Sequence, residues 1–360
     1  MKYLKGFLLF LLATSVLMPY SAEANSELPK SIGKAPWMYT PHDISDHWAR
    51  ETLLEFLHAD IMTGYIEHNN ATVNLEPNSP ITRAQFIKIL SNALELQYNE
   101  TSPSQSFSDV HSTDWFSKYV EIASSLGIIK GSEGAFHPNS FITRDQATAL
   151  IIRAFGEDIK TSVPETQLFK DIKTDYWAYD FIQIAKIQGI INGYVDEFRP
   201  RELATRAQAS TMIKNALLMN LSKDNTEPLL VFEDYLTKRM ELIAEKDLIG
   251  LFTLTNELTS NYFLSISEGE INFIESLESL KGLELISIET FPNWNTELLY
   301  ATERYAAIKM TGFKYTLTTR DPIYNMKTIH TETCDGVYNL KKTGKEWKIY
   351  SYVPSNYWNN

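Results

Sequence analysis

The chain has 360 residues, of which 44% are hydrophobic and 12% aromatic, a composition typical of packed domains and not of long disordered segments. This length suits two or three domains. The formal net charge of -12 and the pI near 5.2 disfavour a nucleic-acid partner, because phosphate backbones repel an acidic surface. A local cationic site is compatible with this charge.

The first 24 residues have the pattern of a signal peptide. An apolar run from 7 to 18 follows two lysines, and Ala22-Glu23-Ala24 supplies the small residues that a signal peptidase recognises. The run is short for a bilayer span, so we expect cleavage after Ala24, export, and no stable membrane insertion. An uncleaved membrane anchor is the alternative. Residues 25–40 are expected to be an N-terminal linker.

Three copies of one unit follow, at 41–100, 101–160 and 161–218, and each contains the motif Thr-Arg-x-Gln. A tryptophan, a turn with glycine and a proline precede the motif in each copy. The hydrophobic spacing predicts helix, loop, helix in every copy, with the second helix starting at the motif. In the third copy the first helix is expected to bury Trp177, Phe181, Ile184, Ala185 and Ile187.

The motif predicts a capping box at the start of the second helix. A threonine at the N-cap accepts the backbone N–H three residues later, and the glutamine at that position reaches back to the N-cap amide. The predicted pairs are Thr82 with Gln85, Thr143 with Gln146, and Thr205 with Gln208.

Arginine at the first helical position is not explained by capping. A cation there opposes the positive end of the helix dipole, so it should be slightly unfavourable unless an anion compensates it. Arg83, Arg144 and Arg206 occupy this position in the three copies. A guanidinium beside free helix amides is a good receptor for a carboxylate or phosphate, and the repetition therefore indicates binding.

The three copies resemble the S-layer homology family. The matching segments are Phe-x-Asp-[Val/Ile] at 107–110 and 169–172, the tryptophans, Gly-Ile-Ile-x-Gly, and Ile-Thr-Arg-[Ala/Asp]-Gln. The resemblance implies an all-α, pseudo-threefold trefoil whose grooves bind the pyruvylated secondary cell-wall polysaccharide of Gram-positive bacteria. It also implies an exported monomer at the cell wall or surface layer.

Carried over by position, the resemblance makes the three arginines carboxylate binders. The tryptophans are expected either to line the sugar site or to pack in the core, and the glycines either to let backbone approach the ligand or to form tight turns. Two tyrosines follow the glycines, whereas the second copy has Ser132, so this copy is expected to bind less well or not at all. The predicted positions are Trp48, Trp115, Trp177, Gly64, Gly131, Gly193, Tyr65 and Tyr194.

Most family members carry glutamate where this chain has Gln85, Gln146 and Gln208. An amide keeps the capping geometry and removes a negative charge from the vicinity of the arginine. We therefore expect these glutamines to favour an anionic ligand.

Residues 219–228 read as a linker, and 229–360 as an α+β domain. Helices are expected over 228–246, 248–263 and 271–280, and strands over 283–288, 298–310, 313–319, 327–340 and 347–353. A hairpin turn is expected at 341–345. The order of elements resembles the NTF2-like superfamily, which implies a curved antiparallel sheet around a concave cavity.

No catalytic, metal or cofactor site is expected in this domain. His330 and Cys334 would share one face of a single strand, but two ligands do not make a zinc site, and the chain has no second cysteine. A Cys/His nucleophile lacks a third orienting group. Glu257, Glu268, Glu270 and Glu275 read as a solvated acidic face.

The sequence thus predicts a non-covalent cell-wall anchor that displays a small binding or spacer domain. The alternative is a wall-anchored enzyme or small-ligand binder whose activity lies in the C-terminal cavity. Polar groups deep in that cavity would favour the alternative, and a filling of Phe, Tyr and Trp would favour a spacer. A purely structural layer protein is disfavoured by the short C-terminal region.

Overall fold

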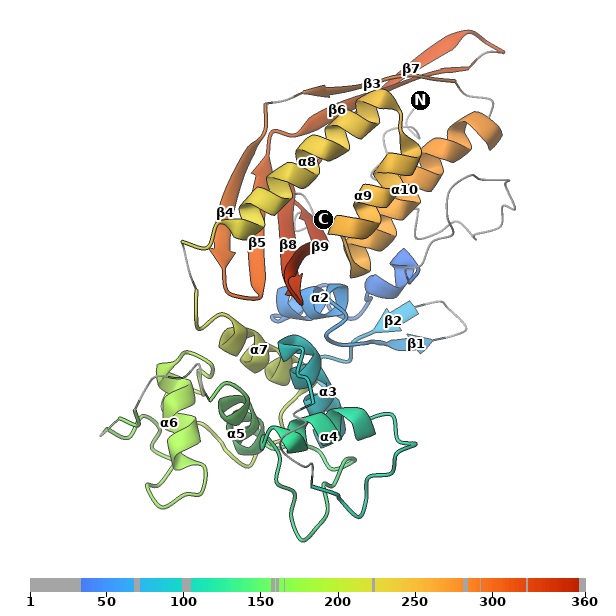
Figure 1. Ribbon diagram of the computed structural model, residues 1–360. Coiled ribbons are helices and arrows are strands. Elements are labelled where there is room, and N and C mark those ends of the chain that lie inside the picture. The colour runs from blue at the N-terminus through green and yellow to red at the C-terminus, as the bar shows by residue number, and fades with distance from the viewer. Residues whose placement is uncertain are drawn as a thin grey trace. The chain divides into compact units, whose positions relative to one another are not determined.

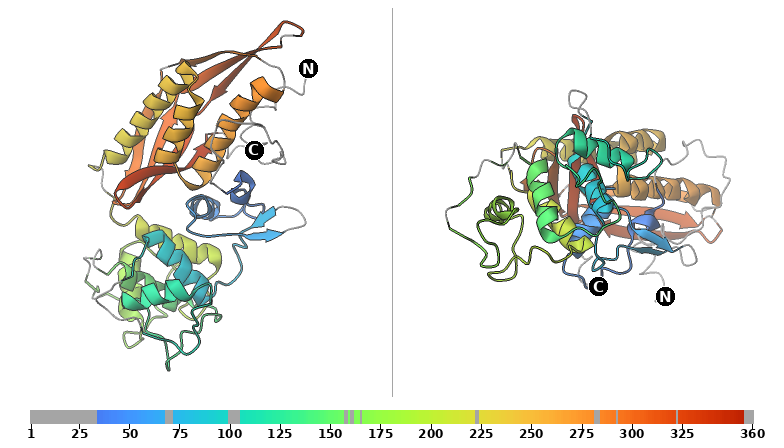
Figure 2. Two further views of the ribbon diagram at one scale, coloured as in Figure 1. Left: turned by 45° about the vertical axis from the view of Figure 1, so that its right-hand side comes forward. Right: turned by 90° about the horizontal axis from the view of Figure 1, so that it is seen from below.

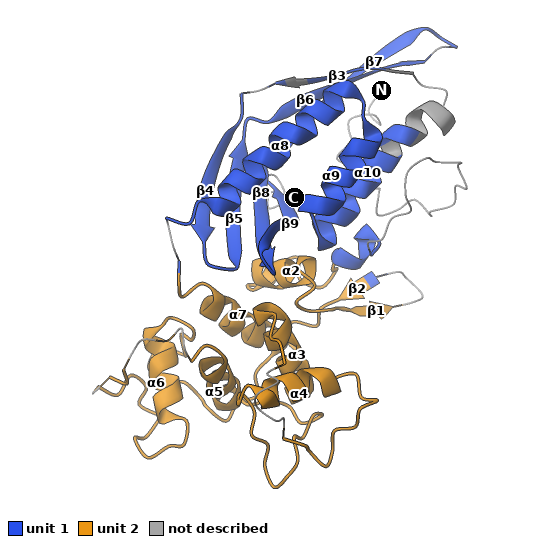
Figure 3. Ribbon diagram, in the orientation of Figure 1, with its two compact units in different colours: residues 1–40, 68–72, 221–360 blue, residues 41–67, 73–220 orange. Residues whose placement is uncertain are grey.

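The computed structural model describes residues 34–67, 72–98, 105–156, 159, 162–164, 166–221, 224–280, 284–291, 293–321 and 323–355. The predicted signal peptide and its cleavage site lie outside these residues. The chain divides into two compact units (Figure 3), one of residues 41–67 and 73–220, the other of 1–40, 68–72 and 221–360. None of the described helices is long and apolar enough to cross a membrane.

In the first unit, each copy provides two helices, as predicted. The elements are α2 (Arg50–His58), β1 (Tyr65–Glu67), β2 (Thr72–Asn74), α3 (Arg83–Leu94), α4 (Ser117–Ser125), α5 (Arg144–Ala154), α6 (Tyr179–Ile187) and α7 (Arg206–Leu217) (Figure 1). Two residues after the end of each first helix, the backbone takes a positive φ, at Asp60 (55°), Gly127 (70°) and Gly189 (71°). Only glycine adopts this conformation without cost, so the first copy has the less favourable helix end.

The helices pack in cyclic order, the second helix of each copy against the first helix of the next. Thus α3 contacts α4, α5 contacts α6, and α7 contacts α2. The backbone closes the same cycle ahead of the arginines: Ile81 N donates to Ala204 O (3.0 Å), Ile142 N to Ile81 O (3.0 Å), and Ala204 N to Ile142 O (2.9 Å). The three copies therefore support one another through a ring of main-chain hydrogen bonds.

The core of this unit takes buried residues from the first helices, the second helices and the loops. In α3 the predicted apolar residues Phe86, Ile89, Leu90 and Ala93 are all buried. The predicted face of the third copy's first helix is partly wrong. Ala185 is buried as predicted, but Trp177 and Ile187 are exposed, and Ile182, which was not predicted, is buried. The helix begins at Tyr179, after the tryptophan, so Trp177 is not part of the helical face.

The second unit combines helices with antiparallel strands. Its helices are η1 (Pro36–Tyr39), α8 (Glu227–Glu245), α9 (Leu248–Leu258) and α10 (Asn261–Leu280), and its strands β3 (Glu284–Phe291), β4 (Asn295–Ala301), β5 (Tyr305–Thr311), β6 (Lys314–Asp321), β7 (Met326–Thr333), β8 (Gly336–Thr343) and β9 (Glu346–Pro354). The strand orders are β3-β6-β7 and β4-β5-β8-β9. Figure 2 shows the long helices along one face of these strands.

Several predicted boundaries in this unit are wrong. The strand expected over 298–310 is two strands joined at Thr302, whose Oγ1 accepts the amides of Arg304 (3.2 Å) and Tyr305 (2.9 Å) and closes a turn. The strand expected over 327–340 is also two, β7 and β8, separated at Cys334 and Asp335. The predicted helix over 248–263 ends at Leu258, and α10 begins earlier than expected, at Asn261. An alternating hydrophobic pattern can continue through a tight turn, so the pattern alone does not show where one strand ends and the next begins.

The predicted final hairpin is confirmed. Strands β8 and β9 pair antiparallel, with Thr343 opposite Glu346, and Gly344 takes φ 63° in the turn. The expected solvated acidic face is partly wrong, because Glu268 is buried and Glu275 is half-buried. Glu257 is exposed as expected, and the side chain of Glu270, which pairs with Arg239, is 39% exposed.

Candidate functional site

All three predicted capping boxes are present at the starts of α3, α5 and α7. In the first copy, Thr82 Oγ1 accepts the Gln85 amide (3.3 Å), and Gln85 Oε1 accepts the Thr82 amide (3.1 Å). In the second copy, Asp145 Oδ1 also accepts the Gln146 amide, at 2.8 Å. The local prediction from sequence was sufficient here, because a capping box needs only residues three apart.

The helix-start amides are not free, in contrast to the expectation from sequence. The amide of each arginine donates to the next copy's loop, at Ser140 O for Arg83, Glu202 O for Arg144 and Ser79 O for Arg206, over 2.9–3.0 Å. The amides of the residues that follow donate to proline carbonyls at positions 138, 200 and 77. The backbone there joins copy to copy and leaves no amide cluster for an anion.

The arginine side chains also cross from one copy to the next. The Nε atoms donate to carbonyl oxygens 53, 54 and 131 residues away: Arg83 to Phe136 (2.9 Å), Arg144 to Phe198 (3.0 Å) and Arg206 to Leu75 (2.7 Å). The guanidinium carbons lie over aromatic rings, 5.0 Å from the Phe136 ring centre for Arg83 and 4.7 Å from the Phe198 ring centre for Arg144. The arginines thus have a structural role that their position on the helix did not reveal.

Burial is the main influence on the charge of these arginines. Desolvation lowers the pKa of Arg83, Arg144 and Arg206 from its usual value, and nearby acidic groups such as Asp109 beside Arg83 partly offset it. An arginine nevertheless stays protonated in proteins. Among the described residues, Arg83 and Arg144 make side-chain hydrogen bonds only through Nε, whereas Arg206 also donates from Nη2 to Thr63 O (3.1 Å) and from Nη1 to the Tyr65 hydroxyl (3.4 Å).

Three aspartates that the sequence analysis did not single out hold the carbonyls that the arginines contact. Each carboxylate accepts two successive backbone amides at 2.6–2.9 Å. The pairs are Asp43 with Leu75 and Glu76, Asp109 with Phe136 and His137, and Asp171 with Phe198 and Arg199. The second residue of each pair has positive φ, between 49° and 59°. The recurrence of Asp in Phe-x-Asp was the signal that could have identified Asp109 and Asp171, whereas Asp43 follows Pro41 and His42 and lacks this phenylalanine.

The glutamines connect the capping boxes to the tyrosines. Gln85 Nε2 donates to the Tyr65 hydroxyl (2.9 Å), and Gln208 Nε2 to the Tyr194 hydroxyl (3.1 Å). Since the Gln85 oxygen is held by the Thr82 amide, its NH₂ group must face the tyrosine. The hydroxyl oxygen of Tyr65 therefore accepts from Gln85 and from Arg206, and its own proton is available to another acceptor.

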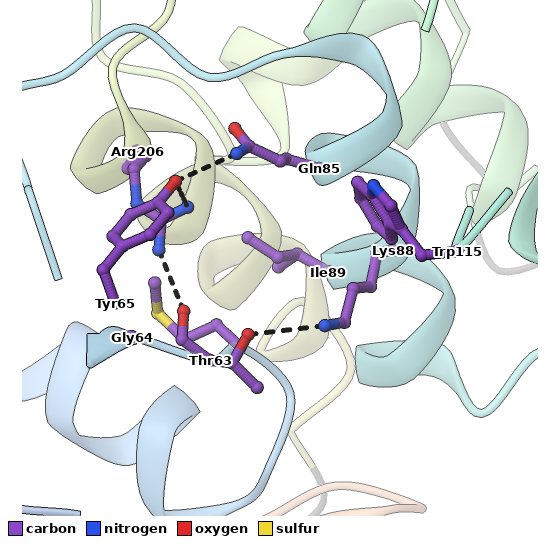
Figure 4. A pocket seen from close by; sticks show the side chains of 9 residues that line it. Thr63, Gly64, Tyr65, Gln85, Lys88, Ile89, Trp115 and Arg206 are labelled. Carbon is purple, nitrogen blue, oxygen red and sulfur yellow. Dashed lines mark hydrogen bonds between the residues drawn. The ribbon is translucent and has the colours of Figure 1, made fainter. Parts of the chain in front are cut away.

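These side chains line a pocket of ≈ 320 Å³ (Figure 4), which we call the first groove. It takes residues from all three copies, because Trp115 belongs to the second and Arg206 to the third. Lys88 Nζ donates to Thr63 Oγ1 (3.3 Å) and lies 5.7 Å from the Trp115 ring centre. The lining residues are Met62, Thr63, Gly64, Tyr65, Gln85, Lys88, Ile89, Trp115 and Arg206.

The equivalent residues of the other copies define the second groove positions (Gly131, Ser132, Gln146, Ala149, Trp177, Arg83) and the third groove positions (Gly193, Tyr194, Gln208, Thr211, Trp48, Arg144). The third positions reproduce the tyrosine, with Arg144 5.0 Å from the Tyr194 ring centre. At the second positions, the Asp145 carboxylate accepts from Tyr176 Oη (2.5 Å) and Trp177 Nε1 (3.2 Å).

The tryptophans are not core residues. Trp48, Trp115 and Trp177 are 65%, 56% and 53% exposed. Of the two roles expected from the sequence, core packing is therefore wrong, and the indole faces are accessible beside the grooves. An exposed aromatic ring of this kind can contact the apolar face of a sugar.

Two of the predicted glycines are required by the backbone. Gly131 and Gly193 have φ of 63° and 73°, and a Cβ at either would lie 2.4 Å from a phenylalanine ring and 2.7 Å from a carbonyl oxygen. Both begin tight turns closed by Ser132 with Ala135 and by Tyr194 with Glu197. The tight-turn role expected from the sequence accounts for them without a ligand.

The interior of the second unit combines aromatic and aliphatic side chains. Phe232, Tyr235, Phe263, Tyr338 and Trp347 belong to its core, and polar residues such as Glu268 and Asn339 are buried in the same unit. Arg239 Nη2 and Glu270 Oε2 form an ion pair (2.6 Å), and although burial opposes the charge, the Glu270 carboxylate holds the pKa of Arg239 above its usual value. Among the described residues, no group of three His, Cys, Asp or Glu could hold a metal ion.

The predicted pairing of His330 with Cys334 on one strand is wrong. His330 is on β7, but Cys334 lies beyond its end, where its amide donates to Phe313 O (3.1 Å). The side chain of His330 lies outside the described part of the structure.

Comparison with known proteins identifies the repeats. The "Exoglucanase XynX" of Acetivibrio thermocellus is 32% identical over 184 residues, which are 49% of this chain and 16% of that protein. The "S-layer protein sap" of Bacillus anthracis is 27% identical over 169 residues, 47% of this chain and 20% of that protein. The "Surface-layer 125 kDa protein" of Lysinibacillus sphaericus is 30% identical over 148 residues, which are 41% of this chain and 12% of that protein.

This chain thus spans at most a fifth of the length of these three relatives. The sequence model of the S-layer homology domain matches residues 106–148 and 168–210, within the second and third copies. The chain therefore carries S-layer homology domains at these two segments.

Proposed function

We propose that the three copies form a pseudo-threefold trefoil that anchors the exported chain non-covalently to a secondary cell-wall polysaccharide, and that the polysaccharide is anionic and pyruvylated. The S-layer homology domains and the S-layer relatives indicate a location at the cell surface. The observation that carries the polysaccharide proposal is a pocket with an exposed indole, a tyrosine hydroxyl and cationic side chains on its walls.

The chemistry of the first groove suits a carboxylate-bearing sugar. Lys88 and Arg206 supply positive charge in a chain whose net charge is -12. The Tyr65 hydroxyl has a proton to donate, and Trp115 offers an accessible ring face. Related positions recur in the other copies, and several weak sites on one repetitive polymer give avidity without a strong single contact.

Sedimentation with purified cell walls tests this proposal. The protein should pellet with native walls and stay in solution with walls stripped of their secondary polymer. Equal binding to both would contradict the proposal. Walls treated to remove pyruvate only should bind less protein if the ketal carboxylate is recognised.

The residues to change are the exposed tryptophans and not the arginines. Arg→Ala variants would also remove hydrogen bonds between copies, so their loss of binding could reflect unfolding. Trp48→Ala, Trp115→Ala and Trp177→Ala together should abolish pelleting while circular dichroism stays unchanged. Normal pelleting of this triple variant would exclude the groove walls as the binding surface.

For the second unit we propose a displayed binding or spacer role. The buried Phe232, Tyr235 and Trp347 support this role, whereas the buried Glu268 and Asn339 are polar groups of the kind that the alternative, an enzyme or small-ligand cavity, would need. The glycosidase relative aligns over about half of this chain and supports an anchor more directly than an activity.

A further inference from the structure

We propose that Lys88, and not Arg206, is the cationic group that contacts the ligand in the first groove. This inference rests on the proposed function, and it assigns a residue role that the repeated motif does not contain. Lys88 follows the motif's glutamine by three residues on α3, and its counterparts in the other copies are Ala149 and Thr211. The first groove is therefore chemically distinct from the other two sets of positions.

The Arg206 side chain is already hydrogen-bonded within the protein. Its three nitrogens donate to Leu75 O (2.7 Å), Tyr65 Oη (3.4 Å) and Thr63 O (3.1 Å), and the side chain is 4% exposed. A guanidinium so engaged would have to break an internal bond before it could form a bidentate pair with a carboxylate. Its charge still contributes to the field of the groove.

Lys88 is better placed to meet a carboxylate. Its ammonium is on the wall opposite Arg206, anchored on Thr63 Oγ1 at 3.3 Å and 5.7 Å from the Trp115 ring centre (Figure 4). Its side chain is half-buried, unlike that of Arg206, and its flexible stem lets the ammonium turn toward a ligand at lower cost than a buried guanidinium. A carboxylate between Lys88 and the Tyr65 hydroxyl would receive a charge-assisted bond and a phenolic O–H bond.

The charges around the other positions differ. At the second groove positions, the Asp145 carboxylate accepts hydrogen bonds from Tyr176 and Trp177. Its negative charge repels an anionic ligand beside the Trp177 indole. At the third, Arg199 lies 4.2 Å from the Tyr194 ring centre but is within 3.6 Å of the Glu197 and Glu202 carboxylates. Only the first groove combines a tyrosine donor, an accessible indole and a lysine among the described residues.

The test isolates the first groove. Trp48→Ala and Trp177→Ala remove the exposed rings of the third and second positions, so that binding in this background depends on the first groove. The released wall polysaccharide is then titrated calorimetrically into this double variant and into the same variant with Lys88→Met. Methionine keeps the apolar stem against Trp115 and removes the charge. Affinity should fall about tenfold, which corresponds to ~1.4 kcal/mol.

Two further variants in the same background serve as controls. Lys88→Arg should retain most of the affinity, because it retains the charge. Lys118→Met removes an exposed lysine of the same unit that does not line the pocket, and should leave the affinity unchanged. The affinity of the Lys88→Met variant should also depend less on salt.

The outcomes separate this inference from the proposed function. Failure of the intact protein to distinguish native from stripped walls would contradict the proposed function. Normal wall binding by the intact protein, together with equal affinities of the background and its Lys88→Met variant, would overturn the role of Lys88 alone. Loss of all binding in the double tryptophan background, with its fold intact, would also overturn it, because the first groove would then have no affinity of its own.

Discussion

At the scale of single residues, the repeated arginine serves two copies at once. Its backbone starts a helix in its own copy, while Nε holds a carbonyl in the loop of the next copy. The unfavourable interaction with the helix dipole is compensated by this hydrogen bond and by an aromatic face. A binding role is thus not needed to explain the arginine, although it remains our proposal that its charge favours an anionic ligand.

The role of glutamine in the motif can be tested with a control inside the chain. Gln85→Glu with Gln208→Glu should weaken wall binding severalfold, because a carboxylate would accept the tyrosine proton that we assign to the ligand and would add negative charge. Gln146→Glu is the matched control, since its copy has Ser132 and no tyrosine there. Equal effects at all three positions in the sedimentation assay would contradict the tyrosine explanation.

Asp109 should contribute stability that depends on pH. Burial alone would raise the pKa of Asp109, but the amides of Phe136 and His137 hold it below its usual value. A lowered pKa in the folded state means that the stabilisation is complete above the unfolded value of ~3.9 and is lost as pH falls through the folded value. Asp109→Asn should cost about 1–2 kcal/mol near neutral pH and less in acid.

Urea denaturation of the wild type and of Asp109→Asn at several pH values would measure this difference. Asp175→Asn, an exposed aspartate of the same unit, is a suitable control and should have little effect at any pH. A constant difference between wild type and Asp109→Asn from neutral to acid pH would show that ionisation of Asp109 does not matter.

At the scale of elements, helices α8 and α10 are joined by the Arg239–Glu270 pair, in which the arginine side chain is 13% exposed and the glutamate side chain 39%. Glu270→Met alone should destabilise the protein by about 2 kcal/mol, because it leaves the poorly solvated guanidinium of Arg239 without its partner, whereas Arg239→Met leaves a partly exposed carboxylate and should cost less. Arg239→Met combined with Glu270→Met should cost less than the sum of the single changes.

Thermal unfolding of the two single variants and the double variant would give the coupling energy. Glu270→Gln, which keeps the shape of the side chain, separates the loss of charge from the loss of packing. Additive effects of Arg239→Met and Glu270→Met would mean that the pair contributes nothing as a pair.

At the scale of the whole molecule, the chain passes from one compact unit to the other near Leu221, between the end of α7 and the start of α8. Leu221 is 56% exposed, and the predicted linker of 219–228 is shortened by α8, which starts at Glu227. Limited proteolysis should therefore cleave first between 218 and 226.

The resulting fragments test which unit binds walls. The fragment that contains residues 41–220 should pellet with native walls, and the fragment from 227 onward should stay in solution. Gel electrophoresis of pellet and supernatant is sufficient to show this. Pelleting of the C-terminal fragment by itself would show that the second unit, and not the repeats, binds the walls.

The three copies, their helix starts and the resemblance to S-layer homology domains could be predicted from the sequence, because capping boxes and repeat spacing depend on residues close together in the chain. The direction of the arginine side chains could not, since their acceptors are 53 to 131 residues away and become neighbours only in the folded unit. The folded unit also shows that the tryptophans are exposed and that Lys88 lies with Arg206 in one pocket. Burial and groove composition depend on which copy packs against which, and this cyclic packing is not encoded in any local pattern.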